Sequence, residues 1–434
     1  MVGYALYLSW FYLVTMMSSK KRLVIIGGGA AGIFCAVNAA RMNPALQVTI
    51  LEKSNKLLSK VKVSGGGRCN VTHACFEIQE MSKRYPRGEH FARKAFHQFF
   101  TTDTIEWFQE RGVRLKEETD GRMFPVTDSS QTIIDCLMKE VNKHGVEILM
   151  NREVKKLKVE SGKWEVELGN DETMVADFVC IASGGFPKLQ QFDWLKGTGH
   201  SIVSPVPSLF TFNMPKHPIT ELMGVVVPEA TIKIQSTKLK NTGPLLITHW
   251  GMSGPCVLKL SAWGARELQE RNYDFTININ WLNDAKEQEV KDELQLIRNT
   301  KGSQKIINNN LFQLPNRLWQ FLLQHAGVKE EWRWADLPSK EQNKLIQLLC
   351  NHEFQVKGKT TFKDEFVTAG GVDLKQVDPN TMQSKLQSNL FFAGEILDVD
   401  GITGGFNFQH AWTSGFIAAK TIAQDRTFAK VQSV

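Results

Sequence analysis

Glycines at one particular spacing mark the first place where this sequence could do chemistry. Gly27, Gly29 and Gly32 follow the apolar run LVII and precede a helical pattern. This G-x-G-x-x-G spacing is typical of a dinucleotide-binding turn. The first glycine permits a tight turn, the second lets backbone N–H groups approach a pyrophosphate, and the third lets helix and strand pack closely. Glu52 ends the next expected strand and can accept hydrogen bonds from a ribose hydroxyl. A purely structural turn is the alternative.

The stretch SGGGRCNV, residues 64–71, places bare backbone beside a cation and a thiol. Glycine lets the chain pass close to a flat ring such as an isoalloxazine. Arg68 could complement a pyrophosphate or a developing negative charge, and Asn70 could form a hydrogen bond with the ring edge. Cys69 is not part of a C-x-x-C pair, so we expect a packed, unreactive thiol rather than a redox partner.

A third glycine-rich stretch near the C-terminus favours FAD over NAD. Gly394, Glu395, Gly401, Gly404 and Gly405 lead into an expected helix over 406–422. The N-terminus of that helix could face the N1–C2=O edge of a flavin, which becomes more negative on reduction. The alternative is a strand-to-helix turn that only packs.

A histidine in an unusual run is the remaining candidate for acid–base chemistry. His249 lies in THWGMSGP, residues 248–255, and histidine can serve as an acid or a base next to a flavin. A structural histidine is the alternative, and Gly251 and Gly254 could simply form a turn.

The elements that must position these residues alternate between strand and helix patterns. Further strands are expected over 47–51, 175–182 and 389–395, and helices over 33–41, 91–111, 131–144, 285–298 and 339–349. The pattern becomes β-rich after Pro205, polar and helical over 283–352, and glycine-bordered again near Thr368. We therefore expect an α/β fold whose middle is an insertion. The expected domains are 18–204 and 368–434 for the two parts of a dinucleotide-binding domain, 205–282 and 353–367 for a β-rich domain, and 283–352 for a helical subdomain.

Composition limits the partners and the compartment. The 434 residues carry a net charge of +7, but no basic run with interleaved aromatics is present, so no nucleic-acid partner is expected. Seven irregularly spaced cysteines argue against a disulfide framework and for a reducing, cytoplasmic location. Cys69, His73 and Cys75 lack a second ligand pair, so no metal is expected.

The apolar stretch over residues 1–17 has no charged start and no cleavage site. We interpret it as an upstream start-codon assignment, with a peripheral anchor as the alternative and no membrane span expected.

Taken together, six ordered motifs resemble the bacterial FAD-dependent oxidoreductases of the BaiN/YhiN type, which include aminoacetone oxidases. The motifs are VIIGGGAAG, VSGGGRCNVT, GRMFPVTDSS, THWGMSGP, TAGGVDLKQVDPNTMQSK and FFAGEILDVDGITGGFNFQHAWTSG. The resemblance spans nearly the whole chain from Lys21. It implies a Rossmann-like FAD-binding domain of the two-dinucleotide-binding type, assembled from both chain ends, with a β-barrel-like domain and a helical subdomain inserted between.

Carried onto this sequence, the resemblance implies a set of FAD contacts. They fall on Gly27, Gly29, Ala30, Ala31, Gly32, Glu52, Lys53, Gly65, Gly66, Gly67, Arg68, Asn70, Val154, Ala182, Ser183, Gly184, Gly394, Glu395, Gly401, Gly404, Gly405, Phe406 and Asn407. One departure is visible: the family follows its ATGG turn with Gly-Ser-Thr-Gly-Asp-Gly, whereas this chain has IASGG and then WLKGTGHS, which puts contacts near Thr198 in doubt.

The expected activity is hydride transfer between a small organic substrate and N5 of non-covalently bound FAD, with Arg68, Asn70 and His249 facing the ring. A second nucleotide fingerprint is missing. NAD(P)H could dock transiently to reduce the flavin, or the substrate could reduce it and oxygen reoxidise it. The alternatives are a tRNA-modifying flavoprotein and a flavin-binding protein without turnover. The sequence does not indicate the oligomeric state.

Overall fold

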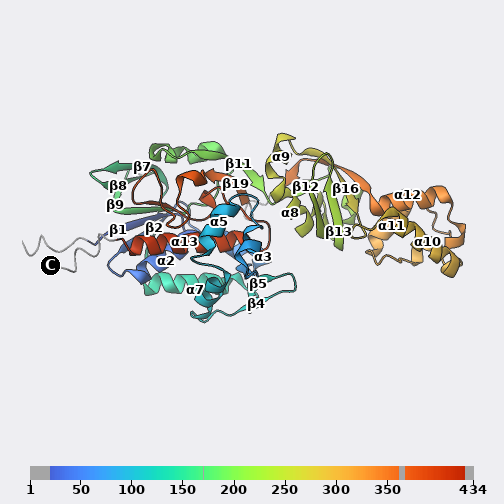
Figure 1. Cartoon of the computed structure of the whole chain (residues 1–434), viewed down its shortest axis with the longest axis horizontal. Helices are drawn as coiled ribbons and strands as arrows, with labels where there is room; N and C mark the ends of the chain where they lie inside the picture. The colour runs from blue at the N-terminus through green and yellow to red at the C-terminus, as the bar shows by residue number, and fades with distance from the viewer. Residues whose placement is uncertain (1–19, 170, 361–366, 426–434) are drawn as a thin grey trace, which may run out of the picture. The chain divides into compact units, whose positions relative to one another are not determined.

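The computed structural model describes residues 20–169, 171–360 and 367–425 (Figure 1). The apolar stretch over 1–17 lies outside these residues. The described chain forms two compact units. Unit 1 contains 20–205 and 370–425, so both ends of the chain contribute to it, and unit 2 contains the described residues of 206–369. Strands β11 (Ile202–Ser208) and β19 (Val367–Val372) pair with each other, and each contains one of the two points where the chain passes between the units.

A five-stranded parallel sheet forms the centre of unit 1, in the order β20-β10-β1-β2-β6. Its strands are β1 (Arg22–Ile26), β2 (Gln47–Glu52), β6 (Glu147–Met150), β10 (Phe178–Ile181) and β20 (Leu390–Phe392). Every residue of β10 and β20 is buried, as continuous apolar runs predict for parallel strands covered on both faces. The C-terminal strand therefore completes a sheet that the N-terminal residues begin. This confirms the expected α/β Rossmann-like fold.

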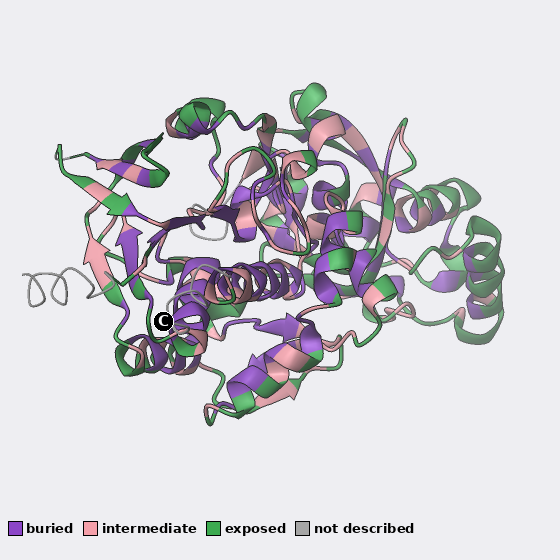
Figure 2. Cartoon of the chain, turned by 60° about the vertical axis from the view of Figure 1, so that its left-hand side comes forward, coloured by how far each residue is buried: buried purple, intermediate pink, exposed green. Residues whose placement is uncertain are grey.

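Two helices from opposite ends of the chain pack side by side in unit 1. These are α2 (Ala30–Met42) and α13 (Phe406–Ala423), drawn in blue and red in Figure 1. Small residues let them approach closely: a Cβ added at Gly415 would lie 2.7 Å from the backbone oxygen of Ala31. Both helices are largely buried, and Figure 2 shows buried residues, in purple, along them and the sheet.

Smaller elements complete unit 1, including two three-stranded antiparallel sheets, β3-β5-β4 and β7-β8-β9. The remaining bounds are α3 (Ser59–Gly67), β3 (Thr72–His73), α4 (Ile78–Ser82), α5 (Glu89–Phe96), α6 (Thr101–Gln109), β4 (Leu115–Glu117), β5 (Arg122–Pro125), α7 (Ser130–Lys143), β7 (Val154–Glu160), β8 (Lys163–Leu168), β9 (Thr173–Ala176) and the 3₁₀ helices η1 (Leu189–Thr198), η5 (Leu374–Gln376) and η6 (Gly394–Ile396).

Two predictions for unit 1 are wrong in the same way, because a segment predicted as one element forms two elements in the structure. The helix expected over 91–111 breaks between α5 and α6, because the Asp103 carboxylate accepts a hydrogen bond from the Phe100 backbone N–H at 2.6 Å and starts a new helix. The strand expected over 175–182 breaks at Asp177, which accepts from the Arg22 backbone N–H at 2.8 Å. On either side of this break, β9 pairs antiparallel with β8 and β10 pairs parallel with β1.

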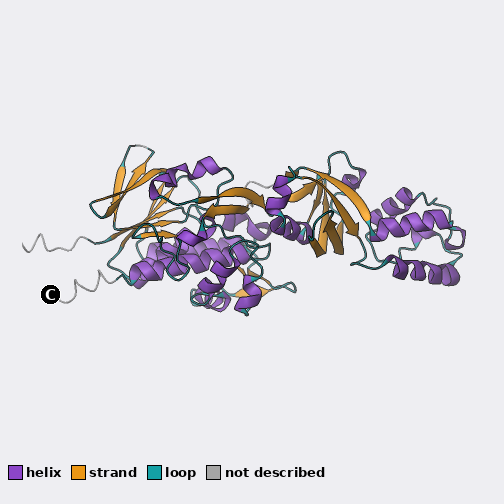
Figure 3. Cartoon of the chain, turned by 45° about the horizontal axis from the view of Figure 1, so that its top comes forward, coloured by secondary structure: helices purple, strands orange, loops and turns teal. Residues whose placement is uncertain are grey.

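Unit 2 is built on a seven-stranded antiparallel sheet in the order β17-β16-β13-β14-β15-β12-β18. Phe275, Ile277 and Ile279 of β16 point into the core while the residues between them face outward, which is the period-two pattern of a half-buried strand. The strands and the helices over 287–350 share one hydrophobic core. Figure 3 shows strands in orange and helices in purple.

The bounds in unit 2 are β12 (Thr211–Asn213), η2 (Pro218–Leu222), β13 (Val226–Ile234), β14 (Lys240–Thr248), β15 (Gly251–Ser253), α8 (Pro255–Trp263), α9 (Ala265–Glu270), β16 (Asp274–Asn280), α10 (Glu287–Lys301), η3 (Ile306–Asn308), α11 (Asn316–Ala326), η4 (Trp334–Asp336), α12 (Ser339–Cys350), β17 (His352–Lys357) and β18 (Lys359–Thr360).

Candidate functional site

The first glycine turn joins β1 to α2 at the carboxyl edge of the parallel sheet. Gly27 has φ +115°, and a Cβ there would lie 2.4 Å from the Ala182 backbone oxygen. A Cβ at Gly32 would lie 2.0 Å from the Gly27 oxygen. Neither position has room for a side chain. Gly29 is the opposite case, since no atom lies within 4 Å of its would-be Cβ, and it begins α2 without a side-chain cap. The turn thus offers an open helix N-terminus to an anion.

Glu52 is held in place beside this turn. Its Oε2 accepts a hydrogen bond from the Gly28 N–H at 2.9 Å, and its Oε1 accepts from the Ser54 N–H at 2.9 Å and the Ser54 hydroxyl at 2.8 Å. These bonds fix the carboxylate at the end of β2. The neighbouring Lys53 ammonium lies 5.2 Å from the centre of the Phe186 ring.

The second glycine stretch kinks the end of α3 into an exposed loop. Gly65, Gly66 and Gly67 all have left-handed φ values, and no atom lies within 4 Å of the would-be Cβ of the last two. Cys69 is also left-handed, at φ +62°, a strained conformation for a residue with a side chain. Its thiol is fully buried, and burial raises its pKa to about 12, so it is not a nucleophile at neutral pH.

Arg68 already has acidic partners within unit 1. Its guanidinium lies 2.5 Å from a Glu118 oxygen and 3.5 Å from an Asp128 oxygen, and it stacks on the Phe124 ring with 4.0 Å to the centroid. The hydrogen bond to Glu118 raises the Arg68 pKa further. A role for Arg68 at a pyrophosphate therefore remains a prediction, and it would require the arginine to share its charge with these acids.

The second and third glycine stretches meet, although more than 300 residues separate them. With its amide oriented to satisfy its neighbours, Asn70 donates to the Thr72 carbonyl and accepts from the Gly405 N–H, each at 2.9 Å. His73 Nδ1 lies 3.0 Å from the Gly404 oxygen. A Cβ at Gly405 would lie 2.5 Å from the Thr72 oxygen, so only glycine fits.

Further expected contact residues gather around these loops. The Lys60 ammonium lies 2.5 Å from a Glu395 oxygen. The Ser183 hydroxyl is buried and has no hydrogen-bond partner among the described residues. The Asn407 side chain accepts from the Gly401 N–H at 2.8 Å and donates to the Gly401 carbonyl at 2.9 Å, which closes the loop before α13.

The other expected positions lie in neighbouring elements. A Cβ at Gly394 would lie 2.8 Å from the Ala31 Cβ, and a Cβ at Gly184 would lie 3.9 Å from a Glu395 oxygen. Val154 is buried at the start of β7 and pairs with Leu168.

His249 lies in unit 2, whereas Arg68 and Asn70 lie in unit 1. Its ring is exposed in the turn between β14 and β15, and its centroid is 3.6 Å from that of the Trp250 ring. The structure therefore brings Asn70 together with the C-terminal loop within one unit and presents His249 separately on the other.

Several residues around the site were not predicted from the sequence. Asp400 is fully buried and paired with Arg87, and Tyr85 is buried against the C-terminal loop. Gln409 on α13 accepts from the Thr72 hydroxyl at 2.6 Å and from the Thr104 hydroxyl at 3.0 Å. The only available signal was an acid, Asp400, placed directly before a glycine-rich run.

The residues present fit an FAD molecule. Two helix N-termini, at Gly29 and Gly405, lack side-chain caps. Unfilled space lies over Gly29 and Gly66, and a buried hydroxyl, on Ser183, lacks a partner. These are the features that a negatively charged pyrophosphate and a flat ring require.

The fold and these loops define a class, the FAD-binding proteins with a Rossmann-like domain. The family model described as the HI0933-like protein Rossmann domain matches residues 21–421, and the chain belongs to this family. This is the BaiN/YhiN-type family that the motifs resembled, so that expectation is confirmed.

Two proteins are similar to this chain over nearly the whole length of both sequences. The chain is 31% identical over 403 residues to ribosomal RNA dihydrouridine synthase of Escherichia coli, covering 91% of this chain and 96% of that protein. It is 28% identical over 405 residues to 3-dehydro-bile acid delta(4,6)-reductase of Clostridium scindens, covering 91% and 97%. Among solved structures, 3-ketosteroid delta1-dehydrogenase from Sterolibacterium denitrificans is 12% identical with a TM-score of 0.49, covering 92% of this chain and 99% of that one.

Across residues 20–169, 171–360 and 367–425, no helix is long and apolar enough to cross a membrane. In the same part of the chain, no group of three His, Cys, Asp or Glu side chains is arranged to hold a metal ion.

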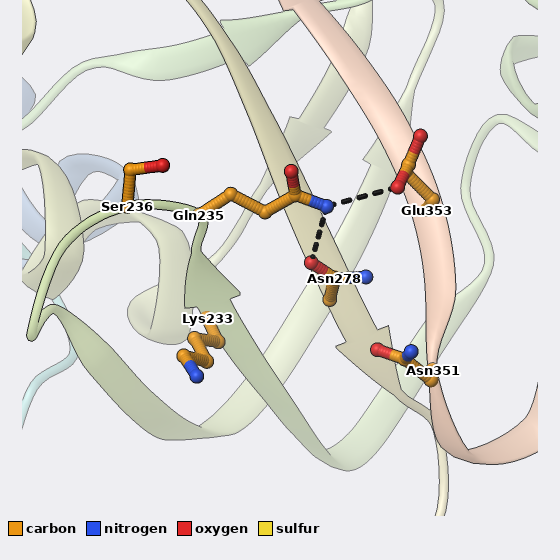
Figure 4. A pocket seen from close by; sticks show the side chains of 6 residues that line it. All are labelled: Lys233, Gln235, Ser236, Asn278, Asn351 and Glu353. Carbon is orange, nitrogen blue, oxygen red and sulfur yellow. Dashed lines mark hydrogen bonds between the residues drawn. The ribbon is translucent and has the colours of Figure 1, made fainter.

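Figure 4 shows a polar hollow on the outward face of the unit 2 sheet, where Gln235 donates to Asn278 at 2.8 Å and to Glu353 at 2.9 Å. It contains none of the expected cofactor residues.

Proposed function

We propose that this protein is an FAD-dependent reductase that adds hydrogen across a carbon–carbon double bond conjugated to a carbonyl group. The observation that carries the proposal is near full-length similarity to two enzymes whose named reactions share this chemistry. A 3-dehydro-bile acid with 4,6 double bonds is a conjugated dienone. Dihydrouridine is uridine whose ring double bond, conjugated to a carbonyl, has been saturated. Membership of an FAD-dependent oxidoreductase family is established, and the bond that is reduced is the proposed part.

The first glycine turn would hold the ADP half of the cofactor. The N–H groups at the start of α2 would donate to the pyrophosphate over Gly29, the position without neighbouring atoms. Glu52, whose carboxylate is fixed by Gly28 and Ser54, would accept from a ribose hydroxyl. The Ser183 hydroxyl would gain the hydrogen-bond partner that it lacks among the described residues.

The second and third glycine stretches would hold the ring half. When held there, FAD would supply hydride-transfer chemistry, from a reductant such as NAD(P)H to the substrate carbon farther from the carbonyl. The uncapped N-terminus of α13 at Gly405 would stabilise negative charge at the ring edge. The loop over Gly65–Gly67 has no side chains to obstruct the ring face.

A proton must also reach the carbon next to the carbonyl to complete the addition. We propose His249 as the acid, because its ring is exposed in a short turn and an imidazolium can donate a proton. In the net reaction, NAD(P)H gives one hydride and leaves as NAD(P)⁺, His249 gives one proton, and the substrate gains two hydrogens. A proton from solvent then restores His249.

The substrate is proposed to be either a small enone or a uracil ring in RNA. Similarity to a ribosomal RNA dihydrouridine synthase supports the RNA, while the 3-dehydro-bile acid reductase supports the small molecule. Nucleic acid thus belongs among the candidate substrates, against the expectation from the charge pattern of the sequence.

The test follows the flavin spectrum under anaerobic conditions. We expect FAD-loaded protein to be bleached by NADH or NADPH, and to regain its colour when a 3-keto-4-ene steroid or a uridine-containing RNA is added. Mass spectrometry should find two added hydrogens, and the saturated analogues serve as controls. His249→Ala should slow recovery of colour without slowing bleaching. The proposal would be contradicted if oxygen reoxidised the reduced protein while neither the steroid nor the RNA did.

A further inference from the structure

We infer that residues 84–88, the 84–88 clamp, position the loop over 399–406 and the start of α13 against the flavin. Arg87 and Tyr85 are the positioning residues of this clamp. The inference deepens the proposed function and rests on it, because the loop matters to chemistry only if FAD lies against it. The clamp follows α4 and precedes α5, and nothing in its sequence resembles a nucleotide-binding motif.

The centre of the clamp is an ion pair between Arg87 and Asp400. Asp400 is fully buried, and the Arg87 side chain is 12% exposed. Arg87 Nε donates to Asp400 Oδ1 at 2.5 Å, and Nη2 donates to Oδ2, so the guanidinium grips both carboxylate oxygens. The two backbones also form an antiparallel bridge. A two-pronged bond of this kind fixes orientation as well as distance.

Neighbouring residues extend the grip along the loop. The Tyr85 hydroxyl donates to the Phe406 carbonyl at 2.6 Å, at the first residue of α13. The Arg84 carbonyl accepts from the Ile402 N–H at 2.9 Å. The clamp therefore holds the loop at three successive places, ending where the helix begins.

Glycines on both sides allow this close fit. A Cβ at Gly88 would lie 2.6 Å from Val399, and a Cβ at Gly401 would lie 3.2 Å from the Tyr85 ring. The loop also contacts Asn70 of the second glycine stretch and the nearby His73. The loop is thus held both by the clamp and by these two residues.

The buried ion pair points to positioning rather than to stability. Removing a carboxylate from water is costly, and a well-packed apolar pair of similar size often stabilises a protein as much or more. The field of a helix N-terminus falls off within about one turn, so a small displacement of α13 would change its effect on a bound ring. The 84–88 clamp would prevent such a displacement, because the bond between Arg87 and Asp400 fixes both distance and orientation near the start of α13.

The test compares two ion pairs of similar burial in unit 1. Arg87→Met removes the clamp, and Arg111→Met is the matched control, because Arg111 is also 12% exposed and lies 3.0 Å from the 6% exposed Glu140. We expect both variants to lower the unfolding midpoint. Only Arg87→Met should raise the Kd for FAD, by about tenfold or more, and lower the midpoint potential of the bound flavin. Arg87→Lys should recover part of the affinity, since it keeps the charge but not the fork.

Two further measurements separate geometry from the cost of a lone buried charge. Arg87→Met with Asp400→Asn removes both charges, and the FAD Kd should remain raised; a return to the wild-type Kd would overturn the inference. So would an Arg87→Met variant whose Kd and flavin potential match those of Arg111→Met.

If the wild-type protein fails to bind FAD, the proposed function is refuted and the clamp is still tested by hydrogen exchange. Amides over 399–406 should exchange faster in Arg87→Met than in Arg111→Met, and equal rates would refute the clamp.

Discussion

Alanine at Gly29 and alanine at Gly32 should fail in opposite ways, although the two positions share one turn. At Gly32 the added Cβ would lie 2.0 Å from the Gly27 oxygen and 3.4 Å from the Ala182 Cβ. Because ordinary contacts begin near 3.4 Å, the end of β1 would have to move by more than an ångström. Overpacking of this kind costs about 1–3 kcal/mol, and more where the obstacle is backbone. We expect Gly32→Ala to lower stability by about 3 kcal/mol.

At Gly29 the same methyl group meets no protein atom within 4 Å. The backbone there, at φ −88° and ψ −170°, is allowed for alanine. Replacing glycine by alanine at this N-cap position costs about 0.5–1 kcal/mol, well below the cost expected at Gly32. The methyl group would instead occupy space that the pyrophosphate needs in order to reach the N–H groups of α2. We expect the Kd for FAD to rise by about tenfold or more, which is a loss of about 1.4 kcal/mol of binding free energy.

The assay is denaturant unfolding of the flavin-free protein together with FAD titration of each variant. We expect Gly29→Ala to unfold only slightly earlier than the wild type and to bind FAD weakly, and Gly32→Ala to unfold much earlier. Wild-type FAD affinity in Gly29→Ala would show that the turn does not hold the pyrophosphate. Wild-type stability in Gly32→Ala would refute the steric argument.

Three further predictions concern single side chains. Burial lowers the pKa of His352, which accepts from the Trp281 indole at 3.3 Å, to about 3. A histidine in the unfolded chain has a pKa near 6.5. Between about pH 6.5 and pH 3 only the unfolded chain therefore binds this proton. Because of His352, the free energy of unfolding should fall by about 1.4 kcal/mol for each pH unit of acidification in that range. Denaturant unfolding at several pH values should show that slope reduced in His352→Gln, and equal slopes would contradict it. The buried Cys69 thiol, with its pKa raised to about 12, should resist alkylation until the protein unfolds, whereas the half-buried Cys75 should be alkylated before it. Mass spectrometry of the labelled peptides gives the order of labelling. Labelling of Cys69 in the folded protein would contradict this prediction. Asn407→Asp keeps the bond from the Gly401 N–H but sets a carboxylate against the Gly401 carbonyl, so FAD titration should find a weaker Kd, and an unchanged Kd would show that the loop closure does not matter.

The parts of the fold that follow from local pattern were predictable from the sequence. The glycine spacing and the buried apolar run identified the first strand, turn and helix, and the strand near the C-terminus was expected to join the same sheet, as β20 does. The errors came where one polar side chain interrupts a continuous pattern. Asp103 restarts a helix within 91–111, and Asp177 divides the strand expected over 175–182. Periodicity reports which face is buried but not which backbone group a carboxylate binds.

By itself, the sequence determined the family, the cofactor class and the three glycine-rich stretches, because glycine is demanded wherever backbone must turn tightly or admit a ligand. Only the tertiary structure decided which distant residues meet: Arg87 with Asp400, 313 positions apart, Lys60 with Glu395, 335 apart, and Asn70 with Gly405. Such contacts depend on where two segments lie after the chain has packed, and an isolated arginine or aspartate in a sequence carries no record of its partner.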